Sequence, residues 1–164
     1  MKTTMGFAAA LLLLTSGTVT AVDPPPMKEG LWSIRNQSVN SPGDKKSDHT
    51  STVCRSHAYD QHALQDEKAM KGCKTVSESL QGSQYSIHTH CVVAGTVIDS
   101  ESIVTFTGDT GAHSESHATY NPALGGISAM TLIQDQKYVG GCPAGVQPGD
   151  ITQPDGTVIH TWKH

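Results

Sequence analysis

Alternation of apolar and polar residues dominates the chain. Trp32 and Ile34 alternate with polar neighbours, the period-two pattern of a half-buried strand, and predict a first strand over 31–39. From residue 73 onward, β-branched residues recur between turn dipeptides and predict strands over 73–80, 85–98, 102–108, 112–120 and 127–139. Short loops join these strands, so we expect a mainly β fold: an antiparallel meander or small open barrel.

Three other segments lack this alternation. The polar stretch 40–51, punctuated by Pro42-Gly43, predicts an exposed loop. From 56 to 71 the β-branched residues vanish and Tyr59, Ala63 and Met70 share one helical face, so a short helix capped by Gly72 is expected. The Pro- and Gly-rich segment 143–155 should run over the surface before 157–162 adds an edge strand.

Residue parity predicts which side chains share a face. Inward positions in the central strands are Tyr85, Ile87, Cys91, Val93, Val104 and Phe106, with Phe106 opposite Val93. A three-residue loop with Gly111 left-handed would set Ser114 and Ser116 opposite Phe106 and Val104. The other parity, His113, Glu115 and His117, then faces outward.

The amino terminus predicts a secretory signal peptide. Lys2 precedes a short apolar run ending at Leu14, and Ala21 suits signal peptidase. The run is shorter than the ~20 residues that span a bilayer, so no membrane anchor is expected, and the protein should be periplasmic or extracellular. The expected organisation is a signal peptide over 1–21, one β-rich domain over 22–142 and a C-terminal extension over 143–164.

Four cysteines in a small exported chain predict two disulfides. In a hairpin that turns at 81–84, Cys73 and Cys91 face each other and should bridge neighbouring strands. Cys54 and Cys142 then pair by elimination, closing a loop worth roughly 4 kcal/mol in the chain-entropy model.

Over residues 27–142 the chain resembles a family of exported bacterial proteins, domain of unknown function 3617. The matching marks are Gly30-Leu31-Trp32, Cys54, Cys73, Cys91 followed by Gly95, the turn Phe106-Thr107-Gly108-Asp109-Thr110, and the closing Tyr138-Val139-Gly140-Gly141-Cys142. The resemblance implies a compact exported β-fold and carries over no catalytic residues.

Charge and motifs narrow the function classes. The formal net charge of −4 gives no reason to bind nucleic acid or anionic lipid. No G-x-S-x-G elbow or phosphate-cradling glycine loop is present, and all four cysteines are assigned to bridges, so enzyme activity has no support in the sequence. Our leading hypothesis is a non-enzymatic module that binds a small apolar ligand or a protein partner, and a hydrolase ranks third.

Two candidate sites follow from the strand faces. Inward aromatic residues, Trp32, Tyr85, Phe106 and Tyr120, would line a ligand pocket if the sheet interior is not filled by side chains. Outward histidines, His88, His90, His113 and His117, form the alternative: a surface zinc or copper site if His90 and His113 approach the same end of the sheet. The competing interpretation of the histidines is the polar face of an alternating strand.

Overall fold

A single antiparallel sheet forms the frame of the protein. The computed structural model describes residues 22–162, and the predicted signal segment 1–21 lies outside them. The strands are β1 (Gly30–Ser41), β2 (Lys45–Arg55), β3 (Cys73–Gln81), β4 (Gln84–Val93), β5 (Thr96–Thr107), β6 (Gly111–Leu124), β7 (Ile127–Gly140), β8 (Asp150–Thr152) and β9 (Val158–His160). Their order is β3-β4-β5-β6-β7-β1-β2-β8-β9, which confirms the mainly β, antiparallel fold class.

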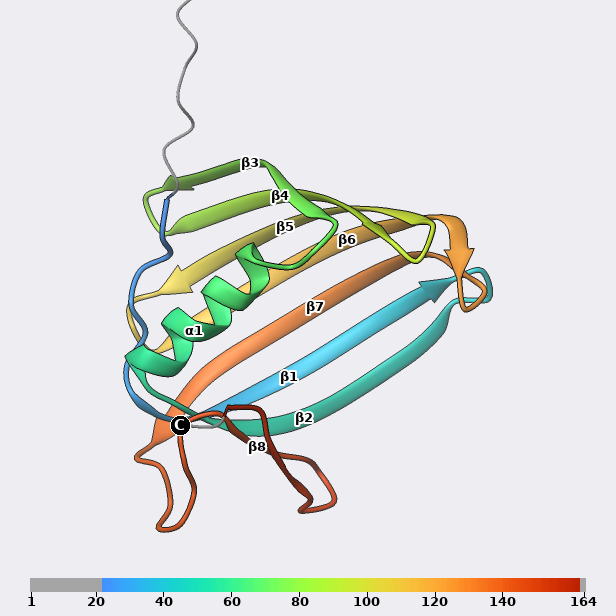
Figure 1. The fold of residues 1–164 in the computed structure, drawn as a ribbon. Coiled ribbons are helices and arrows are strands. Elements are labelled where there is room, and N and C mark those ends of the chain that lie inside the picture. Colours follow the sequence, from blue (N-terminus) through green and yellow to red (C-terminus); the bar gives the residue numbers. More distant parts are fainter. Residues whose placement is uncertain (1–21, 163–164) are drawn as a thin grey trace, which may run out of the picture.

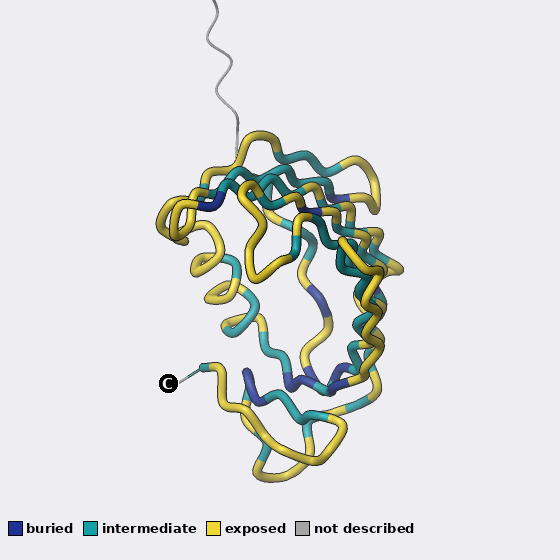
Figure 2. The backbone as a smooth tube through the Cα atoms, turned by 90° about the vertical axis from the view of Figure 1, so that its right-hand side faces the viewer, coloured by how far each residue is buried: buried dark blue, intermediate teal, exposed yellow. Residues whose placement is uncertain are grey.

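The sheet is strongly curved, and α1 (His57–Lys68) lies across its concave side (Figure 1). Ser56 caps the helix by accepting a hydrogen bond from the Tyr59 amide at 3.2 Å, as serine commonly does at this position. None of the helix residues is fully buried, so α1 covers the sheet without filling the space beneath it. The tube view shows the sheet wrapping around one side while the helix stands opposite (Figure 2).

The buried core is small and lies near one end of the sheet. It consists of Met27, Trp32, Val53 and Ala112, with partly buried side chains packed around them. Trp32 is the largest fully buried side chain, and its indole Nε1 donates to the Lys28 carbonyl oxygen at 2.8 Å. The amino-terminal segment is thereby fixed against β1.

The prediction of an exposed loop over 40–51 is wrong, because most of this segment belongs to two paired strands. A tight turn at Gly43 and Asp44, both with positive φ, leads from β1 into β2, and β2 pairs with β1 from Lys45 to Arg55. Residues 45–50 are exposed. A strand that faces solvent on both sides has no apolar alternation to reveal it, and its stability comes from backbone pairing.

The prediction of a single strand over 85–98 is also wrong, because a two-residue turn divides this segment into two strands. Ala94 and Gly95 both have positive φ, which is typical of a type I′ hairpin, and Val93 pairs with Thr96. Phe106 therefore lies opposite Ala112 of β6 and not opposite Val93.

The turn between β5 and β6 also differs in position from the predicted one. Its positive-φ residue is Gly108, not Gly111, and Val104 pairs with Ser114, two residues from the predicted register. A shift of two residues preserves the faces of a strand, so His113, Glu115 and His117 point outward as predicted.

The C-terminal residues extend the sheet beyond β2. β8 pairs with β2 and β9 pairs with β8, which confirms the predicted edge strand near residue 160. β8 itself falls within 143–155, where the sequence predicted irregular surface structure, and its three residues are too few to leave a pattern.

Two disulfides join the predicted partners. Cys73 and Cys91 face each other directly across β3 and β4. Cys54 of β2 is bonded to Cys142, which follows β7. Within residues 22–162, no helix is long and apolar enough to cross a membrane.

Candidate functional site

A pocket of about 950 Å³ lies between the concave face of the sheet and α1. The floor comes from β1, β2 and β4 to β8, the roof from α1, and one wall from residues 23–27. The apolar and aromatic lining is Pro24, Pro25, Pro26, Met27, Ile34, Val53, Tyr59, Ala63, Leu64, Tyr85, Val104, Phe106, Ala112 and Ile151. The lining also contains polar side chains, and several of them lie together on the floor.

Two cross-strand rows of inward side chains make up most of the floor. Strand pairing gives one row as Ile34, Gln136, Ala112 and Phe106, and the other as Asn36, Gln134, Ser114, Val104 and Tyr85. In both rows the β4–β5 end is apolar or aromatic, and the β7–β1 end carries amides. We call these ends the apolar half and the polar half of the floor; the polar half also contains Ile34, and Val53 and Ile151 line the pocket beyond it.

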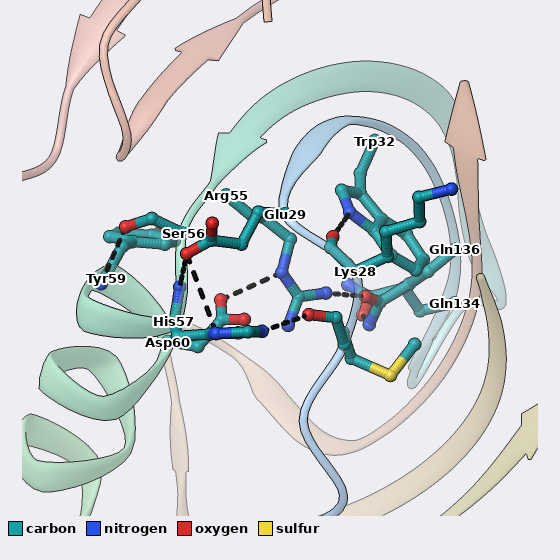
Figure 3. A network of polar contacts seen from close by, with 11 residues as sticks. Lys28, Glu29, Trp32, Arg55, Ser56, His57, Tyr59, Asp60, Gln134 and Gln136 are labelled. Atoms are coloured by element: carbon teal, nitrogen blue, oxygen red, sulfur yellow. Dashed lines mark hydrogen bonds and ion pairs between the residues drawn. The ribbon is translucent and has the colours of Figure 1, made fainter. Parts of the chain in front are cut away.

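The amides of the polar half form one hydrogen-bonded chain with Arg55, and Figure 3 shows its members Arg55, Gln136 and Gln134. Arg55 Nη1 donates to Gln136 Oε1 at 2.9 Å, and Gln136 Nε2 donates to Gln134 Oε1 at 2.5 Å. Gln134 Nε2 donates to Asn36 Oδ1 at 2.8 Å. We call Arg55, Gln136, Gln134 and Asn36 the amide ladder.

Arg55 is held in place on three sides. Its Nε donates to Asp60 Oδ1 of α1 at 2.9 Å, and the two side chains are 17% and 23% exposed. Its guanidinium carbon lies 5.1 Å from the centroid of the Trp32 ring, a cation–π contact that makes the buried indole its support. Because Asp60 neutralises it at close range, Arg55 is a positioned hydrogen-bond donor more than an unpaired cation.

The wall over 23–27 is tied to both ends of α1. At the amino end, His57 Nε2 lies 3.0 Å from the Met27 carbonyl oxygen, and the His57 amide donates to Glu29 Oε1 at 2.9 Å (Figure 3). At the carboxyl end, Lys68 Nζ donates to Asp23 Oδ1 at 3.2 Å. Three consecutive prolines between these anchors restrict the backbone of the wall.

Tyr85 closes the apolar end of the floor. Its hydroxyl donates to Glu78 Oε1, and burial followed by this carboxylate raises the pKa of the phenol far above its ordinary value. Glu78 is itself 4% exposed and lies 3.8 Å from Lys68 Nζ. The phenol is therefore neutral at any physiological pH, and Tyr85 presents its ring to the pocket.

Two of the four aromatic residues predicted to bind a ligand line the pocket, and two do not. Tyr85 and Phe106 line the pocket, whereas Trp32 belongs to the core beneath Arg55 and Tyr120 pairs with Ile98 outside the lining. Sequence reasoning missed the amide ladder. Gln134 and Gln136 occupy inward positions in β7, alternating with Asp135, and polar residues at inward positions were the available signal.

The four predicted metal-ligating histidines lie on the convex face, where His88 and His90 share Asp99 as a neighbour and His113 and His117 have other partners. His90 and His88 lie 2.9 Å and 3.7 Å from Asp99, while His117 Nδ1 lies 3.1 Å from Thr131. His90 of β4 pairs with Asp99 of β5, and Asp99 pairs in turn with Thr119 of β6. His113 of β6 pairs instead with Thr105 of β5, so it lies far from His90 along the strands. The predicted approach of His90 and His113 is therefore wrong.

Carboxylates are the partners of the His88, His90 and His113 imidazoles. Hydrogen bonds to Asp135 at 2.7 Å and to Glu115 at 3.4 Å raise the pKa of His113. The hydrogen bond from His90 lowers the pKa of Asp99. In the described part of the chain, no group of three or more His, Cys, Asp or Glu residues is arranged to hold a metal ion.

The fold and the pocket together define a class: a curved, open antiparallel sheet whose concave face, covered by one helix, encloses a pocket with an apolar and a polar half. A family model described as protein of unknown function (DUF3617) matches residues 27–142. The chain belongs to this family. Among curated proteins, none matches the chain.

Proposed function

We propose that this protein is a non-enzymatic binding module that holds a small, largely apolar molecule in the concave pocket. The observation that carries the proposal is the pocket of about 950 Å³ between the sheet and α1. Pockets for small organic ligands usually have roughly 300–1,000 Å³, mostly apolar walls and a few polar groups that set orientation. A small ligand fits this concave space better than a protein partner, which requires an extended surface.

Binding is favoured over catalysis by the way the polar side chains of the lining are engaged. Arg55 and Asp60 are paired with each other, and the His57 ring contacts the Met27 carbonyl oxygen. Acyl or phosphoryl transfer requires a base beside a nucleophile, and these contacts instead hold the helix and the wall over the sheet.

The proposed site of action is the periplasm or the extracellular space. Two disulfides in one small domain support this location, because such bonds persist in oxidising compartments.

A pocket-filling variant with a matched control tests the binding proposal. Val104 lines the pocket floor, and its neighbour Ile103 is 47% exposed on the opposite face. The probe is N-phenyl-1-naphthylamine, an uncharged aromatic compound that fluoresces in apolar surroundings. We expect saturable binding to the wild type, at least tenfold weaker binding to Val104→Trp, and unchanged binding to Ile103→Trp.

Circular dichroism and urea unfolding of both variants check that each is folded. Absence of saturable probe binding to the wild type would contradict the proposal. Equal binding by folded Val104→Trp and the wild type would do the same, because the probe would then bind outside the pocket.

A further inference from the structure

We infer that the ligand of this pocket is an uncharged amphiphile with an apolar chain and a hydrogen-bond-accepting head group such as an ester or ketone carbonyl. The inference rests on the proposed function and adds the chemical class and orientation of the ligand. The head group lies on the amide ladder, and the chain lies along the apolar half of the floor beneath α1.

The orientation follows from the division of the floor. The ladder amides Gln134 and Asn36 and the apolar residues Val104 and Tyr85 occupy one cross-strand row. From β7 to β4 there are three strand spacings of about 4.7–4.9 Å, or roughly 14 Å along the sheet. A chain of medium length spans this distance, and Leu64 and Ala63 of α1 cover it from above.

The preference for an accepting head group follows from the direction of the ladder. A guanidinium can only donate, so the Gln136 atom that contacts Arg55 must be the amide oxygen. Gln136 Nε2 then donates to Gln134, so the Gln134 atom that accepts must be its amide oxygen. In the same way, Gln134 Nε2 donates to the amide oxygen of Asn36. Among the hydrogen bonds of the described residues, none uses the Asn36 amide nitrogen, so the ladder ends on a donor.

Arg55 also strengthens that donor. Hydrogen bonds in a chain polarise one another, so a cation that donates to the first carbonyl oxygen, that of Gln136, makes the N–H groups that follow more positive. The unused hydrogens of the ladder therefore favour a ligand oxygen with free lone pairs.

The charges around the pocket disfavour a carboxylate or phosphate head group. The lining contains one arginine, Arg55, and three carboxylates, Asp23, Asp60 and Glu67. Beside it, Lys68 lies within ion-pair distance of Asp23 and Glu78. Arg55 is paired with Asp60, and Lys68 with Asp23. An anionic head group would meet a net negative surrounding with no unpaired cation.

Three probes that share a ten-carbon chain test the head group by ¹⁵N NMR titration of the full mature chain: methyl decanoate, decanoate and protonated decylamine at pH ~7.5. We expect methyl decanoate to bind at least tenfold more tightly than either charged probe. The side-chain amide signals of Gln134 and Gln136 should shift with the ester and not with N-phenyl-1-naphthylamine.

Two pairs of variants separate the ladder from general hydrophobicity. Gln136→Leu should weaken ester binding about tenfold, as expected for a lost hydrogen bond, and leave N-phenyl-1-naphthylamine unchanged. Gln37→Leu, on the convex face of β1, should change neither. Asp60→Asn frees the charge of Arg55 and should raise decanoate affinity about tenfold, whereas Glu67→Gln, an equal charge change away from Arg55, should raise it less.

The outcomes distinguish the two proposals. If N-phenyl-1-naphthylamine binds in the pocket but decanoate or decylamine binds as tightly as the ester, the inference is overturned and the binding function stands. An unchanged ester affinity in folded Gln136→Leu also overturns it. If neither N-phenyl-1-naphthylamine nor the ester binds, the proposed function fails first.

Discussion

The Cys54–Cys142 disulfide joins β2 to the segment after β7 across a sequence separation of 88 residues, whereas Cys73–Cys91 spans 18 residues between neighbouring strands. In the chain-entropy model these loops correspond to about 4.6 and about 3.2 kcal/mol at 25 °C. Cys54 is also 1% exposed, so replacing it with alanine removes buried sulfur contacts worth about 1 kcal/mol. We therefore expect Cys54→Ala/Cys142→Ala to lose about 2 kcal/mol more unfolding free energy than Cys73→Ala/Cys91→Ala.

Urea unfolding followed by far-ultraviolet circular dichroism measures this difference. With a urea m-value of about 2 kcal/mol/M, the midpoint of the long-loop variant should fall about 1 M below that of the short-loop variant. Free energies extrapolated to water are compared, because removing a cross-link expands the unfolded chain and changes m itself. An equal or smaller loss for the Cys54–Cys142 variant would refute the reasoning from loop length and burial.

Hydrogen bonds to Asp135 and Glu115 raise the pKa of His113, so its ion pairs stabilise the fold fully below the unfolded pKa of ~6.5 and are lost as pH rises through the higher folded value. His113→Gln should therefore lower the unfolding free energy at about pH 5.5 and leave it unchanged at about pH 8.5. The loss should be less than about 1 kcal/mol because the side chain is half exposed. An equal loss at both pH values argues against ion pairing. The exported protein should begin at Val22 or within a few residues of it, and an intact mass that retains residues 1–21 would disprove the signal-peptide prediction.

The family match runs from Met27, the last residue of the wall, to Cys142 and so covers β1 to β7. The matched region contains Arg55, Gln134 and Gln136 of the amide ladder and the whole of α1. β8 and β9 lie beyond it, and β8 contributes Ile151 to the pocket lining. The ligand class inferred for this chain is therefore testable in other members through the residues that align with the ladder.

Local sequence patterns were sufficient to predict the strands that bury one face. Trp32 and Ile34 revealed β1, and the outward parity of His113 and His117 survived a two-residue error in register because side chains in a strand alternate with a period of two. The hairpin turn at 81–84 placed Cys73 opposite Cys91 for the same local reason. Where both faces meet solvent, as at the start of β2, no alternation existed to be detected.

The sequence by itself thus determined the antiparallel β class, the short helix, the Cys73–Cys91 pairing and the faces of the central strands, because each depends on periodicity or on residues near one turn. The Cys54–Cys142 pairing then followed by elimination. Only the tertiary structure decided the pocket. Its amide ladder joins Arg55 to Gln136 across 81 residues, and its roof exists because α1 crosses the concave face without filling it. Sheet curvature and helix docking depend on long-range pairing, which no local pattern of apolar and polar residues encodes.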